Sequence, residues 1–422
     1  MKTILLGSNK LLVSIIVILF LFFFIFGMPT PIGSLTPLLA LGTILWGVLN
    51  YKVYFLYFPK EILFLFLFLF FDLLVCLFVP ILLGTYDFSI VQTKTNLIAS
   101  LLATYVLAKS FCLNKKISDK QFFNLLLVIF LIQAILVVAM LTNSDLSQLI
   151  TSFTRNSDQG ARVLDTYAGA RGLGIADSSA FGFAIVMGLF IFLTFVAYKN
   201  KFIGLKFFSI LILIGGVASV SAGRTAILGL ILGLIYSLLN FKNARSLKIL
   251  ISTFVIIFVA GVFLLSIDRD SIQNETLGYF YSYSMEPILN YLNTGGFSSS
   301  STSGLQRMYF PLTEQQYLIG DGRYMNGESY YMSTDAGYMR FALFYGGIFS
   351  FIFYSYFSYF VVRVTSFNKN YMVPIFFLLL FSFALHYKGE VVLFSISYNK
   401  VLFLILFFLY LRSIGLKKVT LS

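Results

Sequence analysis

Residues 61–83 read EILFLFLFLFFDLLVCLFVPILL, an almost uninterrupted apolar run with one internal aspartate. A helix of this length, rising about 1.5 Å per residue, crosses a hydrocarbon core that is about 30 Å thick. Similar runs recur along the chain, and we predict about twelve spans, at residues 11–27, 32–50, 61–83, 96–113, 121–142, 176–198, 205–220, 225–240, 249–267, 336–362, 371–387 and 391–411. Because lipid leaves no backbone polar group unpaired, we predict an all-α polytopic bundle, with residues 1–422 as a single membrane domain.

The composition excludes a soluble globular chain, since 59% of the residues are hydrophobic and only 11% are charged. The first apolar stretch follows Lys2 and Lys10 and is similar to a signal peptide. However, the residues from Met28 onward lack a small-x-small cleavage site, so we expect an uncleaved first span. Cys76 and Cys112 both fall in predicted spans, which supports neither a disulfide framework nor a thiolate metal site.

Lysines are concentrated in alternate connections between the predicted spans and near both ends of the chain. By the positive-inside rule, these loops and both termini are expected to be cytoplasmic. Two long polar segments, 142–175 and 268–334, then become external loops that cap the bundle. The lipid bilayer is the first expected partner.

Most arginines fall on the predicted external side, whereas the predicted cytoplasmic loops carry mostly lysine. Arginine presents a planar fork that binds phosphate oxygens in pairs, so an anionic ligand is indicated on the external side. The alternative is that these arginines pair with external carboxylates. His386, the sole histidine, cannot build a histidine metal site by itself, and we expect no metal, no cofactor and no nucleic-acid partner. Carboxylate-bound Mg²⁺ or Ca²⁺ is the alternative that the residues leave open.

Two candidate anion sites lie at the external ends of predicted spans. The stretch from Arg171 to Ser179, RGLGIADSS, combines an arginine, two glycines and a helix start whose free N–H groups favour anions. An ordinary capped helix start is the alternative. Arg224 occupies the tight turn SVSAGRTA, where an ionisable residue is costly unless it is paired; a snorkelling interfacial arginine is the alternative.

A third candidate site runs from Arg307 through Gly320-Asp321-Gly322-Arg323 to Asp335 and Arg340. Asp335 and Arg340 are expected near the external mouth of the tenth span. Asp335 is either a helix N-cap or a general base for a sugar hydroxyl.

The fourth candidate is the turn HYKGE, which contains His386, Lys388 and Glu390. Such a density of titratable groups beside lipid indicates function. The alternative is a wet turn in which Lys388 and Glu390 pair with each other.

In this order, the features resemble the O-antigen polymerase (Wzy-type) family and the related O-antigen ligases. The stretch RGLGIADSSAFG from Arg171 is similar to the family's R-x-x-G-x-x-x-x-N, and SAGRT around Arg224 to its S-x-S-R-T turn. Two departures are that residues 177–179 lack the frequent Pro-Asn pair and that Gly223 replaces a serine. Asp335-Ala336 stands where ligases carry His-Asn, which favours a polymerase.

The resemblance implies transfer of a glycan from undecaprenyl diphosphate onto a new lipid-linked repeat unit, at the outer leaflet of a bacterial inner membrane. The lipid-linked oligosaccharide would be the substrate, and a chain-length regulator is a candidate partner. The implied roles are diphosphate or glycan binding by Arg171, Arg224, Arg307 and Arg323; proton acceptance by Asp335, or else by His386 or Glu390; and orientation by Arg340 and Lys388.

Two other functions remain open from the residues. A ligase would use the same chemistry with a different acceptor. A transporter or lipid flippase should carry ionisable residues deep within its spans, and only Asp72, Lys109 and Lys400 are candidates for such positions.

Overall fold

The computed structural model describes residues 8–30, 33–114, 117–154, 173–178, 181–239, 244–266, 272, 274–296 and 300–415. The all-α prediction is confirmed: apart from two hairpins of two-residue strands, all regular structure in these ranges is helical. The chain is thus an all-α protein of the polytopic membrane class.

Within the described ranges, nine helices are long and apolar enough to cross a membrane. They are Lys60–Leu82 (α4), Ser89–Leu113 (α5), Asp119–Thr142 (α6), Phe181–Lys199 (α9), Leu205–Ala222 (α10), Ala244–Val262 (within α12, Ala244–Ser266), Gly337–Ser366 (α16), Lys369–His386 (η4, Lys369–Tyr371, with α17, Met372–His386) and Ile396–Ser413 (α18). Three shorter apolar segments are Leu12–Phe26 in α1 (Ser8–Phe26), Leu35–Leu49 (α2) and Arg224–Leu238, which joins η1 (Arg224–Ala226) to α11 (Ile227–Leu238). Twelve apolar segments therefore coincide with the twelve predicted spans, nine of them at full spanning length.

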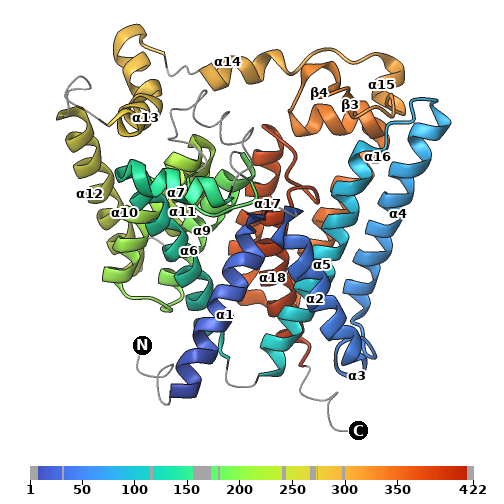
Figure 1. Ribbon diagram of the computed structural model, residues 1–422, viewed down its shortest axis with the longest axis horizontal. Coiled ribbons are helices and arrows are strands. Elements are labelled where there is room, and N and C mark those ends of the chain that lie inside the picture. Colours follow the sequence, from blue (N-terminus) through green and yellow to red (C-terminus); the bar gives the residue numbers. More distant parts are fainter. Residues whose placement is uncertain are drawn as a thin grey trace. The chain divides into compact units, whose positions relative to one another are not determined.

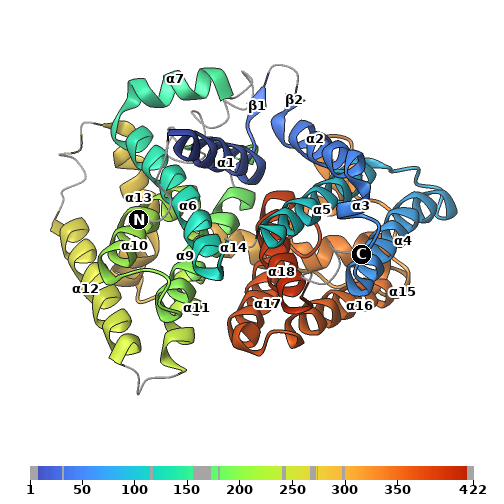
Figure 2. The same cartoon turned by 90° about the horizontal axis from the view of Figure 1, so that it is seen from below.

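The helices form two compact units, the first from residues 1–39 and 116–286 and the second from residues 40–115 and 287–422. In the first unit, α9 is surrounded by α6, α10 and α11, which lie side by side in Figure 2. A side chain on Gly229 would collide with the carbonyl oxygen of Gly188, so this glycine allows α11 to approach the backbone of α9. The first unit also contains α7 (Ser144–Thr154) and the hairpin of β1 (Pro29–Thr30) and β2 (Gly33–Ser34).

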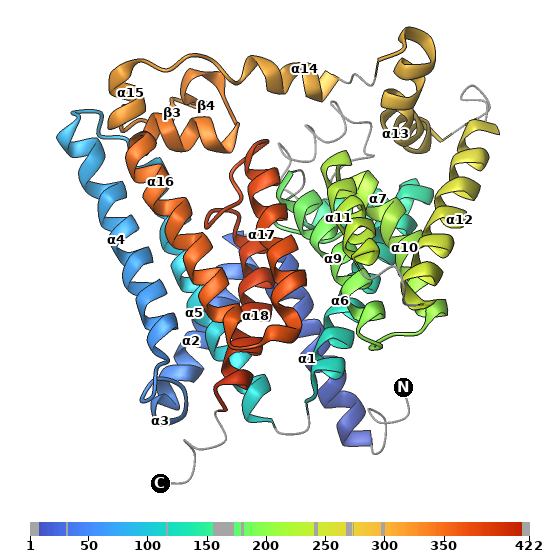
Figure 3. The same cartoon turned by 180° about the vertical axis from the view of Figure 1, so that it is seen from behind.

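In the second unit, the buried helix α18 packs on α5 and α16, and α16 packs on α17 (Figure 3). The remaining elements of the second unit are α3 (Tyr51–Tyr54), α14 (Ser300–Arg307), α15 (Glu314–Leu318), β3 (Met325–Asn326), β4 (Ser329–Tyr330) and η3 (Tyr331–Ser333). The helix α13 (Glu275–Thr294) begins in the first unit and ends in the second.

The segment between α15 and α16 forms a short hairpin near the N-terminal end of α16, with α15 packed on α16 (Figure 1). Gly346 has φ +78° and interrupts the helical geometry of α16. A Cβ atom at Gly346 would collide with the carbonyl oxygen of Leu318, and one at Gly347 with that of Tyr317. The paired glycines Gly346 and Gly347 therefore dock α15 against α16.

The predicted start of the last span is wrong. The last span was expected to begin at residue 391, but α18 begins at Ile396, and residues 387–395 form an irregular connection from α17. The amides of Val391 and Val392 donate to Nδ1 of His386, 3.0 and 3.2 Å away, which ties this irregular connection to the end of α17. This connection carries most of the candidate site.

Candidate functional site

The N-terminal end of α16 and the connection 387–395 meet through a glycine. A Cβ atom at Gly337 would lie 2.5 Å from the carbonyl oxygen of His386 and 2.6 Å from that of Gly389. Backbone is far less able to move aside than a flexible side chain, so only glycine permits this approach. It brings two predicted sites, one around residue 335 and one around residue 390, into a single cluster.

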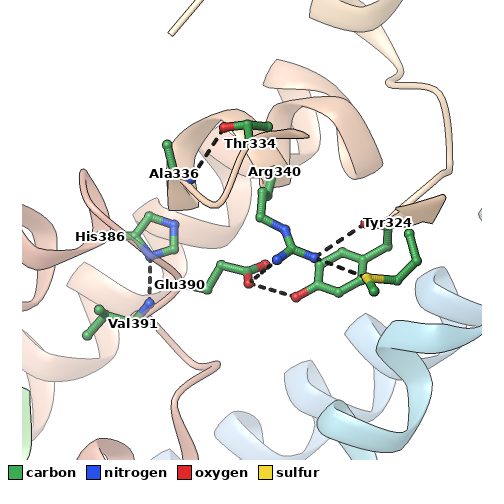
Figure 4. A network of polar contacts seen from close by, with 8 residues as sticks. Tyr324, Thr334, Ala336, Arg340, His386, Glu390 and Val391 are labelled. Carbon is green, nitrogen blue, oxygen red and sulfur yellow. Dashed lines mark hydrogen bonds and ion pairs between the residues drawn. The ribbon is translucent and has the colours of Figure 1, made fainter. Parts of the chain in front are cut away.

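Arg340 lies in the first turn of α16 and is 4% exposed. The carbon of its guanidinium is 3.7 Å from the ring centroid of Tyr324 and 3.7 Å from that of Tyr330, so two aromatic rings flank the cation. One guanidinium nitrogen donates to the carbonyl oxygen of Tyr324 at 3.3 Å, and another lies 3.2 Å from Oε2 of Glu390 (Figure 4). These contacts hold the guanidinium of Arg340 beside the carboxylate of Glu390.

Among the described residues, only one of the two carboxylate oxygens of Glu390 has polar partners. Its Oε2 accepts a hydrogen bond from the Tyr324 hydroxyl at 2.7 Å in addition to the ion pair with Arg340. Its Oε1 is buried and has no hydrogen-bond partner among the described residues. Burial raises the pKa of Glu390 to about 7, against the opposing effects of Arg340 and Tyr324. A carboxyl group with this pKa exchanges its proton near neutral pH.

Asp335 is exposed beside this cluster. The N-cap role that the sequence left open is wrong, because Ala336 is the N-cap residue of α16 and its amide donates to the Thr334 hydroxyl at 3.3 Å. Protein atoms around the carboxyl group nevertheless desolvate it and raise its pKa, while the charges of Arg340 and Lys388 act in the opposite direction. Asp335 is therefore an accessible carboxylate of raised pKa, and both properties suit a general base.

His386 is buried at the end of α17 with both ring nitrogens engaged. Its Nδ1 accepts from the amides of Val391 and Val392, and its Nε2 lies 2.8 Å from the Tyr354 hydroxyl. Because Nδ1 accepts, the neutral ring carries its proton on Nε2 and donates it to the Tyr354 oxygen. This geometry favours a positioning role for His386 and leaves Asp335 and Glu390 as the stronger candidates for a base.

Two stacked tyrosine rings lie near Asp335. Tyr309 stacks on Tyr387 with ring centroids 4.5 Å apart, and its hydroxyl donates to the Tyr387 carbonyl oxygen at 2.6 Å. Arg307, two residues before Tyr309, is exposed at the end of α14. Arg323 is also exposed, with its guanidinium carbon 5.6 Å from the Tyr331 ring centroid.

Of the other two predicted arginines, Arg224 belongs to the first unit. Arg224 lies 2.5 Å from Oε2 of Glu286 and 4.3 Å from the ring centroid of Tyr283, so the turn between α10 and α11 is tied to α13. This is a paired arginine, as the carboxylate alternative proposed. Arg171 lies outside the described residues. The structure thus brings Asp335, Arg340, Lys388 and Glu390 together in the second unit, with His386 four residues before Glu390 in the chain, whereas Arg224 belongs to the first unit.

The sequence analysis missed Asp87, which supports the hairpin that carries Tyr324. Its Oδ2 accepts from the amides of Tyr324 and Met325, both at 2.6 Å, and its Oδ1 accepts from Ser89. Burial opposes ionisation of Asp87, but these hydrogen bonds outweigh it and lower the pKa. An aspartate two residues before a helix start was the available signal, although its partner hairpin lies far along the chain.

No group of three or more His, Cys, Asp or Glu side chains in the described ranges has a geometry suited to a metal ion. The cluster itself offers two carboxylates of raised pKa, a buried guanidinium, a lysine and stacked tyrosines. Such a set can accept a proton and stabilise negative charge.

Comparison of the chain with protein-family models, curated proteins and solved structures gives no match. The function of the chain is therefore inferred from its helical membrane fold and the geometry of this cluster.

Proposed function

We propose that the chain is a polysaccharide polymerase of the bacterial inner membrane. It transfers a growing glycan from undecaprenyl diphosphate onto the sugar of a fresh lipid-linked repeat unit at the outer leaflet. The observation that carries the proposal is the pair of carboxylates, Asp335 and Glu390, held beside Arg340 at the end of a candidate membrane span. The end of a membrane span lies at the membrane surface, and the reacting groups of a lipid-linked substrate lie there too.

In the proposed reaction, a hydroxyl oxygen of the acceptor sugar bonds to the anomeric carbon of the donor glycan. The bond between that carbon and the diphosphate oxygen breaks, and undecaprenyl diphosphate leaves with the electron pair. Asp335, the exposed carboxylate, accepts the hydroxyl proton. Glu390 and Arg340 keep the neighbouring backbone in place, and Lys388 balances the charge of Asp335.

The diphosphate requires cations that are accessible. Arg307 and Arg323 are exposed in the same unit as Asp335, which supports them as the diphosphate-binding residues. Arg224 would first have to exchange Glu286 for a phosphate group. The stacked Tyr309 and Tyr387 supply an aromatic face suited to a sugar ring.

The direct test uses purified protein, chelator and an undecaprenyl-diphosphate-linked oligosaccharide repeat as the only substrate. The proposal predicts a ladder of product lengths on a gel. Unchanged substrate, from folded protein offered several repeat structures, would refute polymerase activity. Products formed only with a lipid A core acceptor would assign the chain to the ligases instead.

Transport is the second candidate, and one observation favours it. Asp72 and Lys94 form an ion pair that is 1% exposed on both sides, within the candidate spans α4 and α5. Buried charges of this kind line the pathways of transporters. Movement of a fluorescent lipid-linked oligosaccharide across proteoliposomes, without any change in its length, would support this function over polymerisation.

A further inference from the structure

Lys94 was not among the expected mid-span charges, because the span that contains it was predicted to begin at residue 96. The helix α5 instead begins at Ser89, which places Lys94 inside the bundle. Its Nζ lies 2.9 Å from Oδ2 of Asp72 on α4, and both side chains are 1% exposed.

Burying this ion pair carries a desolvation cost for the folded protein. Desolvating two charges costs several kcal/mol for each ion, and two packed apolar side chains often serve stability equally well or better. Residues 61–83 already supply ample apolar surface for α4. The pair therefore calls for a role besides holding α4 to α5.

The contacts of Lys94 lead to the connection between α17 and α18. Its Nζ also donates to the carbonyl oxygen of Leu393 at 3.4 Å. Leu393 has φ +46°, an unfavourable conformation for a branched side chain, and it follows Glu390 by three residues. Four aromatic rings enclose the ammonium group, with ring centroids 4.6 to 5.6 Å from Nζ: Phe341, Tyr345, Phe353 and Phe394.

We propose that Lys94, with its charge balanced by Asp72, is a positioning residue that fixes the 387–395 connection and thereby holds Glu390 at its pair with Arg340. The assignment to a transfer reaction rests on the function proposed above. The effect on Glu390 is a property of the protein alone.

The groups that face Glu390 come from four segments. Arg340 on α16 and Lys94 on α5 favour the carboxylate, as does the hydroxyl of Tyr324 in the hairpin segment. Asp335 opposes ionisation. If Glu390 takes up a proton, Arg340 is left buried without a counter-charge, and the hydrogen bond from Tyr324 loses its charged acceptor. Lys94 is the cation that opposes this outcome from within the bundle.

The test compares the unmodified protein with three purified variants by infrared spectroscopy without substrate. The carboxyl stretch of Glu390, identified by its absence in Glu390→Gln, is titrated with pH. In Asp72→Asn/Lys94→Met, which leaves no unpaired charge buried, the midpoint should rise by roughly one pH unit. In the conservative variant Lys94→Arg, the midpoint should stay near that of the unmodified protein. An unchanged midpoint in the double variant, or an equal rise in Lys94→Arg, would overturn the proposal.

Polymer formation adds a second readout. In the double variant, the pH below which polymer formation declines should be higher than in the unmodified protein. In Lys94→Arg this pH should be unchanged, and the substrate KM should be nearly unchanged in both variants. If the unmodified protein makes no polymer at any pH, the proposed function fails while the infrared titration still judges the role of Lys94. If the protein makes polymer and the infrared midpoint does not move, the role of Lys94 alone fails.

Discussion

Replacing Glu390 by glutamine should remove a pH dependence of stability that originates in one buried carboxyl group. The side chain is 8% exposed, and burial raises its pKa from 4.5 to about 7. The folded protein therefore binds this proton more tightly than the unfolded chain. Its stabilising contribution is complete below the unfolded pKa of 4.5 and is lost as the pH rises through the folded value of about 7.

The size of the effect follows from the difference between the two pKa values. At about 1.4 kcal/mol for each pH unit, a difference of about 2.5 units corresponds to roughly 3 kcal/mol, nearly all of it lost between about pH 4 and about pH 8. Glutamine keeps an acceptor for Arg340 and Tyr324 but cannot ionise. Over this range, the stability of Glu390→Gln should therefore decline less than that of the unmodified protein, by that amount.

Chemical denaturation in detergent micelles at a series of pH values measures the difference. Glu328→Gln is the matched control, because Glu328 is an exposed carboxylate between the strands of the β3–β4 hairpin. Its stability should run parallel to that of the unmodified protein at every pH. If the curve of Glu390→Gln also runs parallel, Glu390 is not the desolvated carboxyl group described above.

Three further substitutions test how the cluster is assembled. Gly337→Ala should lower the free energy of unfolding by about 2 kcal/mol or more and abolish activity, because a Cβ atom would meet two carbonyl oxygens there. Gly304→Ala is the control: a Cβ atom there meets no neighbour, so the loss of unfolding free energy should be far smaller. Asp87→Ala should cost about 3 kcal/mol locally, seen as faster hydrogen exchange at the amide of Tyr324, and unchanged exchange would contradict the clamp. His386→Asn, which keeps an acceptor near Nδ1, should retain more activity than His386→Ala, whereas equal and complete loss in both would favour His386 as the base.

The helical membrane fold was predictable because it depends on local composition. Each long apolar run selects a helix whatever its neighbours are, and the predicted spans coincide with observed apolar helices. Boundaries were predictable only where polarity changes sharply. The polar residues 92–95, QTKT, indicated a loop, yet tertiary contacts include them in α5 and bury Lys94.

The composition of the candidate site could be predicted, but its pairings could not. Asp335, Arg340, His386, Lys388 and Glu390 stood out as polar groups at the ends of apolar runs. Glu390 was offered a nearby partner, Lys388, but its ion pair is with Arg340, fifty positions away in the sequence. That pairing depends on the close approach of two backbones at Gly337 and on a hairpin held by Asp87, neither of which leaves a periodic signal.

The assignment of this cluster as the site of glycan transfer is tested most simply by the polymerisation assay, with Asp335→Asn beside the unmodified protein and the control Glu328→Gln. Normal membrane insertion and thermal stability would first be verified for each variant. The account predicts a full product ladder for the unmodified protein and for the control, and loss of the ladder in Asp335→Asn with the lipid-linked substrate still bound. A full ladder from Asp335→Asn would contradict the assignment of this cluster as the site of glycan transfer.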